Sequence, residues 1–201
     1  MDFKKDIKGY LELEQEIISK LDIDEINDAM NAILGCYERG GTVYTCGNGG
    51  SASTASHMVC DFGKGACENV DRKFKFICLN DNVATIMAIA NDDSYENVFL
   101  NQLKGRITKN DLLLAISGSG NSHNVLKAAD YAKEVGAKII GVTGYDGGKL
   151  KKTADFHLDA PVNDMQISED VHLIFNHLMM KIFWRYLLES NGKEAVYKIH
   201  Q

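Results

Sequence analysis

The chain has 201 residues, of which 45% are hydrophobic and 25% are charged. This length and apolar content suffice for one compact core, so we expect residues 1–201 to form a single domain. The formal net charge of −6 gives no general basic surface for nucleic acid, so an anionic ligand requires a local site.

The N-terminal residues and the cysteines both indicate the cytoplasm. Residues 1–6 mix charged and apolar side chains unlike a signal peptide, and no later run is long enough to span a bilayer. The five cysteines form no C-x-x-C pair, and an odd number completes no disulfide framework. We therefore expect reduced, mostly buried thiols and no membrane partner.

Apolar spacing predicts two helices, from Phe3 to Leu21 and from Asp24 to about Arg39, before the first strand. Short aliphatic or β-branched runs then predict strands at Thr42–Cys46, Phe74–Leu79, Leu112–Ile116, Lys138–Val142 and Phe156–Leu158. Further helices are expected at Val83–Ala90, Tyr95–Leu103, Asn121–Val135 and from about Gln166 to Leu188. This alternation predicts an α/β fold in which helices cover a parallel sheet.

The two terminal helices carry more apolar surface than one small sheet is expected to cover. In the last helix the apolar residues are Ile174, Phe175, Met179, Met180, Ile182, Phe183 and Trp184. Self-association would cover the excess, so we expect a homo-oligomer. An ordinary core helix is the alternative interpretation.

A glycine-rich loop, Cys46-Gly47-Asn48-Gly49-Gly50-Ser51, follows the first expected strand and leads into a helix. Glycines let the backbone approach a ligand, and a helix N-terminus offers unpaired N–H groups to anionic or hydroxyl oxygens. The loop matches neither the dinucleotide fingerprint nor the P-loop. A tight turn capped by Ser51 would also explain these residues.

A second loop, Ser117-Gly118-Ser119-Gly120-Asn121-Ser122, has the same construction. Three hydroxyls and several backbone N–H groups are expected to converge there without Lys or Arg, which suits a phosphate monoester held by neutral donors. Both loops follow the carboxyl ends of expected parallel strands, where open α/β sheets bind ligands. Together they predict a ligand site.

Asn91 and Asp92 follow the helix expected at Val83–Ala90. They can accept hydrogen bonds from sugar hydroxyls. Equally, residues 92–94 can cap the helix expected to begin near Tyr95. The sequence pattern alone leaves both interpretations open.

Two pairs of residues have spacings that suit metal or acid–base chemistry. His57 and Asp61 are four residues apart, on one helix face. Glu169 and His177 are eight apart on the final helix, and their rise difference of about 12 Å is awkward for one metal unless Glu169 lies at a bent helix start. Such His/carboxylate sets suit zinc or another first-row divalent metal, and general acid–base catalysis.

The other histidines receive no chemical role. His172, on an apolar helix face, is better interpreted as structural, and no partner pattern surrounds His123, His157 or His200.

Four motifs resemble the phosphoheptose isomerase branch of the sugar isomerase (SIS) domain family over nearly the whole chain. Residues 46–51 resemble its C-G-N-G-G-S, followed by His57, and residues 117–122 match S-[TG]-S-G-N-S. Residues 91–92 match its N-D, and residues 169–172 with His177 are similar to Q-E-x-H-x-x-x-x-H.

The resemblance implies a three-layer α/β/α sandwich around a five-stranded parallel sheet, with extra N-terminal helices and a long C-terminal helix. It implies a homotetramer with sites at subunit interfaces. It also implies isomerisation of sedoheptulose 7-phosphate to D-glycero-D-manno-heptose 7-phosphate through an enediol.

The resemblance further implies the residues of the site. The sugar phosphate would be bound by Asn48, Gly49, Gly50, Ser51, Asp61, Asn91, Asp92, Ser117, Gly118, Ser119, Ser122 and Glu169. One zinc ion per subunit would be held by His57, Asp61, Glu169 and His177. Asp61 and His177 would move protons, and zinc would polarise the substrate oxygens.

Two departures from the family pattern bear on activity, and a third bears on the identity of the substrate. The best-known members have Glu at the position of Asp61 and Gln at that of Glu169, and a sugar-contacting Asp aligns near Gln166. A base displaced by about 1 Å can cost on the order of a hundredfold in rate. Two alternatives therefore stay open: a non-catalytic relative that acts as a replication-initiation scaffold, and a phosphosugar enzyme or sensor for another substrate.

Overall fold

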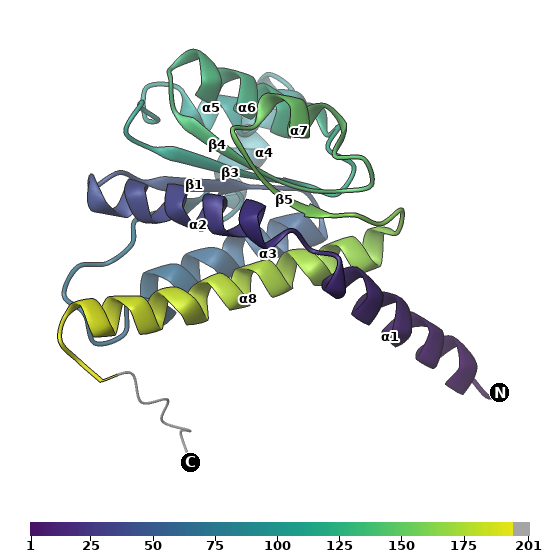
Figure 1. Ribbon diagram of the computed structural model, residues 1–201. Helices are drawn as coiled ribbons and strands as arrows, with labels where there is room; N and C mark the ends of the chain where they lie inside the picture. Colours follow the sequence, from purple (N-terminus) through teal and green to yellow (C-terminus); the bar gives the residue numbers. More distant parts are fainter. Residues whose placement is uncertain (195–201) are drawn as a thin grey trace.

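The computed structural model describes residues 1–194, and its centre is a five-stranded, fully parallel sheet (Figure 1). The strands are β1 (Val43–Cys46), β2 (Phe76–Cys78), β3 (Leu112–Ser117), β4 (Lys138–Gly144) and β5 (Phe156–Ala160). They lie in the order β2-β1-β3-β4-β5. All six residues of β3 are buried, as expected for a central parallel strand covered on both faces.

Helices cover both faces of this sheet (Figure 1). On one face lie α2 (Ile23–Glu38), α3 (Gly50–Cys60) and α8 (Met165–Ser190), which share one apolar core with the sheet. On the other face lie α4 (Val83–Asp92), α5 (Leu100–Leu103), α6 (His123–Glu134) and α7 (Gly148–Thr153). The predicted three-layer α/β/α arrangement is therefore confirmed.

The first helix, α1 (Lys4–Ser19), projects away from the sheet, with the N-terminus at its far end (Figure 1). Its one buried residue is Ile17, whereas Phe3, Ile7 and Leu11 each expose more than half of their surface. The hydroxyl of Tyr10 donates a hydrogen bond to Asp170 on α8, and this bond raises the pKa of Tyr10 to about 12. Apart from this bond and the burial of Ile17, the apolar side chains of Ile7 and Leu11 on α1 remain exposed to solvent.

Seven apolar residues of the last helix were expected to leave apolar surface uncovered by the sheet. For three of them this expectation is wrong. Phe175, Met179 and Phe183 are at most 3% exposed, because they pack into the protein's own core between α8 and the sheet. Ile182 is 39% exposed. Within α8, the interpretation as a core helix thus holds for most of the apolar face.

Three smaller expectations also need correction. The helix predicted at Tyr95–Leu103 is divided into a 3₁₀ turn (Tyr95–Asn97) and α5. Asn91 and Asp92 end α4 instead of following it. Helix α7 was not predicted, because its six residues are too few to show a helical period.

The remaining expectations concern the cysteines, the membrane and one histidine. All five cysteines are free, and only Cys60 is exposed. Within residues 1–194, no helix combines the length and apolar character needed to cross a membrane. His200 lies outside the described residues.

Candidate active site

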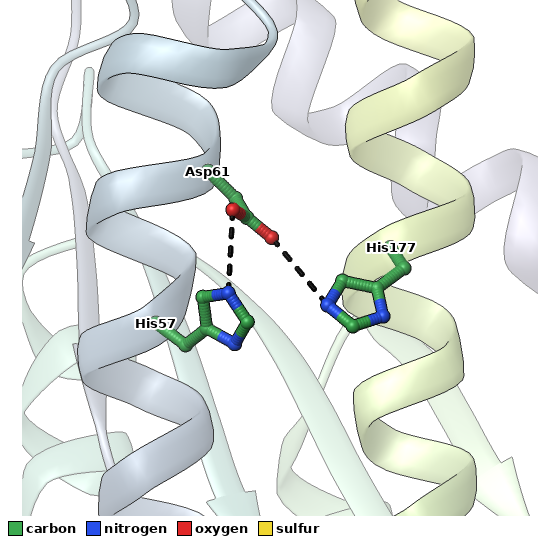
Figure 2. A group of neighbouring side chains, drawn as sticks. All are labelled: His57, Asp61 and His177. Atoms are coloured by element: carbon green, nitrogen blue, oxygen red, sulfur yellow. Dashed lines mark ion pairs between the residues drawn. The ribbon is translucent and has the colours of Figure 1, made fainter. Parts of the chain in front are cut away.

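Three side chains predicted to act in metal or proton chemistry meet between α3 and α8 (Figure 2). His57 Nε2 lies 3.4 Å from Asp61 Oδ1, and His177 Nε2 lies 3.9 Å from Asp61 Oδ2. The two imidazole rings meet edge to face, with their centroids 5.2 Å apart. Asp61 thus lies between two histidines that come from helices far apart in the sequence.

A π-helical turn places Asp61 in this position. The turn covers Asp61–Gly65 directly after α3, and Ala66 N–H donates to the Asp61 carbonyl at 2.7 Å. Phe62, the next residue, is fully buried and stacks on Phe76 at a centroid distance of 4.4 Å. Phe62 anchors the wide turn in the core, so that Asp61 faces α8. Such π-helical turns often occur at functional sites.

The three side chains are accessible to a small molecule. The Asp61 side chain is 14% exposed, whereas those of His57 and His177 are 43% and 52% exposed. Asp61 and His177 line a hollow of about 1020 Å³ that also borders on Lys64 and Met180. The carboxylate is therefore largely shielded, whereas both imidazoles are exposed and that of His177 lines the hollow.

The donor set fits a divalent metal. One ligand atom from each of His57, Asp61 and His177 can be chosen so that all three lie within 4.8 Å of one another. Two imidazole nitrogens and one carboxylate oxygen are zinc ligands, and three protein ligands leave a fourth position open for substrate, as catalytic zinc sites require.

Glu169, predicted as the fourth metal ligand, lies elsewhere. Its carboxylate packs so closely on Gly50 that a Cβ on that glycine would overlap it. Gly50 is the first residue of α3, where unpaired N–H groups and the helix dipole favour a negative charge. The structure thus brings together three of the four residues, because eight residues along α8 separate Glu169 from His177 by about 12 Å.

The two predicted ligand loops lie side by side at the carboxyl edge of the sheet. They follow β1 and β3, which pair directly, at the point where the strand order reverses direction. Ligands of open α/β sheets bind in the crevice at this point. The predicted end of the first strand at Cys46 is confirmed, whereas β3 runs one residue further than predicted, to Ser117. Both loops follow the carboxyl ends of parallel strands, as predicted.

An amide pair joins the first loop to the start of α6, the helix that follows the second loop. Asn48 and Asn124 donate to each other's side-chain oxygens at 2.9 Å in both directions. Tyr95 Oη also donates to Asn48 Oδ1 at 2.7 Å. Because these bonds occupy the Asn48 oxygen twice and one of its two N–H bonds, the amide is left with one N–H to offer a ligand.

In the second loop, the serine hydroxyls are partly engaged with one another. Ser117 Oγ and Ser122 Oγ lie 3.0 Å apart, and Ser119 Oγ accepts from the backbone N–H of Asn121 at 3.2 Å. The hydroxyl proton of Ser119 is therefore available to a ligand. Gly120 has φ +63°, and a Cβ there would overlap the Gly147 carbonyl, so only glycine suits this position.

The predicted residues Asn91 and Asp92 are the last two residues of α4. Asn91 Nδ2 donates to Asp92 Oδ1 at 2.8 Å, and both residues are exposed. Asp93, not Asp92, supports the following turn, since it accepts from Asn97 and Asn101. These hydrogen bonds, first that from Asn97, lower the pKa of Asp93.

His172 is a core residue, as expected. It is 1% exposed, and its Nε2 lies 2.9 Å from the carbonyl oxygen of Thr143 on β4. Burial lowers the pKa of His172 and so favours the neutral imidazole, which can donate to this carbonyl.

Comparison with known proteins agrees with this arrangement. A family model for the SIS domain matches residues 9–144. A phosphoheptose isomerase from Helicobacter pylori is 33% identical over 188 residues, which cover 94% of this chain and 97% of the relative. Another from Clostridium acetobutylicum is 34% identical over 178 residues, or 88% and 90% of the two chains. The chain belongs to the phosphoheptose isomerase family of SIS-domain proteins.

Solved structures of phosphoheptose isomerases share the fold. GmhA from Neisseria gonorrhoeae superposes with a TM-score of 0.83 at 26% identity, over 90% of this chain and 98% of that one. The enzyme from Francisella tularensis gives 0.85 at 28% identity, over 92% and 100%. The predicted family and fold are therefore confirmed.

Three residues that contact the predicted site were not predicted from the sequence: Tyr95, Asn124 and Asn176. Tyr95 and Asn124 resemble ordinary residues at helix starts, so the sequence carries no distinct signal for them. Asn176 does carry a weak signal, because it is an amide inside the apolar run of the last helix.

The amide pair predicts a specific effect on the first loop. Asn124→Ala leaves Asn48 without its buried partner, so we expect a loss of roughly 1–3 kcal/mol in the free energy of unfolding. Backbone amides of Gly49–Ser51 should exchange faster with deuterium, as followed by mass spectrometry. Tyr95→Phe keeps the pair and serves as the matched control, with a smaller change. Unaltered exchange at Gly49–Ser51 in Asn124→Ala would show that the pair does not hold the loop.

Proposed function

We propose that this protein is a phosphoheptose isomerase, which interconverts sedoheptulose 7-phosphate and D-glycero-D-manno-heptose 7-phosphate. The observation that carries the proposal is the meeting of His57, Asp61 and His177, in a chain of this family; Asp61 and His177 also line an accessible hollow. A scaffold has no need for such a cluster, because it performs no proton transfer.

The reaction moves one hydrogen from C1 to C2 and one proton from O1 to O2. An acid–base pair is needed to remove the C1 proton and protonate O2, which gives the enediol, and then to remove the O1 proton and return a proton to C2. Asp61 and His177 form such a pair, since the His177 Nε2 and Asp61 Oδ2 atoms are 3.9 Å apart. Both are assigned this role, and Asp61 also contacts the sugar.

Zinc is the proposed cofactor, one ion per subunit, held by His57, Asp61 and His177. When bound, it would supply a Lewis acid for the substrate oxygens. Glu169 would complete the predicted set only if its carboxylate moved away from Gly50. In its present position it is better suited to contact a sugar hydroxyl.

The two loops are proposed to bind the rest of the substrate. Ser117, Gly118, Ser119 and Ser122 would hold the phosphate with neutral donors, and Asn48, Gly49, Gly50 and Ser51 would meet the sugar. The exposed Asn91–Asp92 pair would reach hydroxyl groups from the end of α4.

We further propose a homotetramer in the cytoplasm. The exposed apolar side chains of α1, which projects from the body of the protein, support self-association (Figure 1). The free and mostly buried cysteines support a reducing compartment.

The direct test is turnover of sedoheptulose 7-phosphate by metal-free protein with and without added zinc, followed through the aldose product. We expect conversion that depends on zinc. If folded, zinc-loaded protein binds phosphosugars but gives no product, the sensor alternative replaces the enzyme. If the folded, zinc-loaded protein binds no phosphosugar, the scaffold alternative replaces the enzyme.

Two substitutions should separate chemistry from binding. His177→Ala removes a proton-transfer group and is expected to abolish measurable turnover, whereas Ser119→Ala removes one phosphate donor and should mainly raise KM. Steady-state kinetics on both variants checks the contrast. An unchanged KM in Ser119→Ala would mean that the phosphate lies elsewhere.

A further inference from the structure

Asn176 on α8 is a fully buried amide that donates a hydrogen bond to Asp61 in the candidate active site. It is 0% exposed, and its Nδ2 donates to Asp61 Oδ2 at 2.7 Å. Its own Oδ1 is buried and has no hydrogen-bond partner among the described residues. An amide buried with its oxygen unpaired is unfavourable compared with an apolar side chain of similar size.

Among the described residues, the buried neighbours of Asn176 along α8 give no other reason for an amide. Its neighbour Phe175 and the residue one turn later, Met179, are buried in the apolar core. An apolar residue would therefore pack well here and leave no orphaned oxygen. The benefit that offsets the orphaned oxygen must lie in the hydrogen bond to Asp61.

This hydrogen bond is the shortest contact of the Asp61 carboxylate with the three side chains around it. His57 and His177 lie at 3.4 and 3.9 Å, beyond ordinary hydrogen-bond distance, whereas Asn176 lies at 2.7 Å. Asn176 therefore fixes the plane of the carboxylate. It occupies one lone pair of Oδ2 and leaves both lone pairs of Oδ1, which faces His57, for a metal or a proton.

We propose that Asn176 is a positioning residue that holds the Asp61 carboxylate in register with His57 and His177 for zinc binding and proton transfer. The proposal rests on the proposed function. It also explains how a carboxylate one methylene shorter than glutamate is used here: the π-turn and the Asn176 amide are fitted to Asp61. A glutamate at position 61 would extend its carboxylate into the space that Asn176 fills.

The first test measures zinc affinity, without turnover. Asn176→Leu keeps the approximate volume and removes the donor, and Asn176→Ala removes the donor while leaving space. Chelator competition should show zinc bound roughly 10–100-fold more weakly by both variants than by the wild type, as found when partners of metal ligands are removed. Met179→Leu, a fully buried change on the same helix, is the matched control and should bind zinc as the wild type does.

Stability distinguishes positioning from a merely structural role. If Asn176 positions Asp61, the zinc-free Asn176→Leu protein should unfold at the wild-type temperature or higher, because the orphaned oxygen is gone, while its kcat falls with little change in KM. A lower unfolding temperature with unchanged zinc affinity and kcat would overturn the proposal.

The second test is a double-mutant cycle with Asp61→Glu. We expect Asp61→Glu alone to lose activity and zinc affinity, and Asn176→Ala to restore part of both in the Asp61→Glu background by making room for the longer side chain. Independent, additive effects would show that the pocket is not fitted to Asp61.

Wild-type measurements separate the two levels of the account. If the wild type neither binds zinc nor isomerises the sugar phosphate, the proposed function fails. If the wild type does both and the Asn176 variants match it in zinc affinity and kcat, only the positioning proposal fails.

Discussion

The packing of α3 and its π-turn against α8 is the constraint on which the rest of the site depends. His57 and Asp61 belong to the first of these segments and His177 to the second, so none of the candidate chemistry exists unless the two segments stay in contact. An aromatic cluster maintains that contact. Phe62 from the π-turn meets Phe183 from α8 at a centroid distance of 5.9 Å, and Phe76 of β2 packs beneath it. The core and the site are thus held by adjacent residues.

The parallel sheet supplies the second requirement, the two loops that are proposed to bind the phosphate and the sugar. Because β1 and β3 are neighbours and their connections leave in opposite directions, the loops that follow them lie at the switch point where open α/β sheets bind ligands. The Asn48–Asn124 pair then joins the first loop to the start of α6, the helix that follows the second loop. Binding and chemistry are consequently assigned to separate elements, the loops for the phosphate and the helices for proton transfer.

Much of this arrangement could be predicted because it has a local or periodic signal. Short aliphatic or β-branched runs predicted all five strands. The four-residue spacing of His57 and Asp61 predicted that their side chains lie close together. The helical rise between Glu169 and His177 also indicated that these two side chains could not easily bind the same metal ion. The resemblance to the family united residues that no periodicity connects, such as Asp61 and His177.

The rest depends on tertiary contacts that leave no regular trace in a sequence. The π-turn at Asp61 arises from the burial of Phe62, and an α-helical continuation would look the same in the sequence. The division of residues 95–103 follows from Asp93, whose carboxylate accepts from Asn97 and Asn101. Asn176 contacts a residue 115 positions away, so its partner could not be named in advance.

The most direct test of the central claim is anomalous diffraction from crystals of the zinc-loaded protein, recorded on both sides of the zinc absorption edge. The account predicts a peak at bonding distance, about 2.0–2.2 Å, from a nitrogen of His57, a nitrogen of His177 and an oxygen of Asp61. A zinc peak that is bonded to none of Asp61, His57 and His177 would contradict the account. The absence of any peak in correctly folded protein would also contradict it.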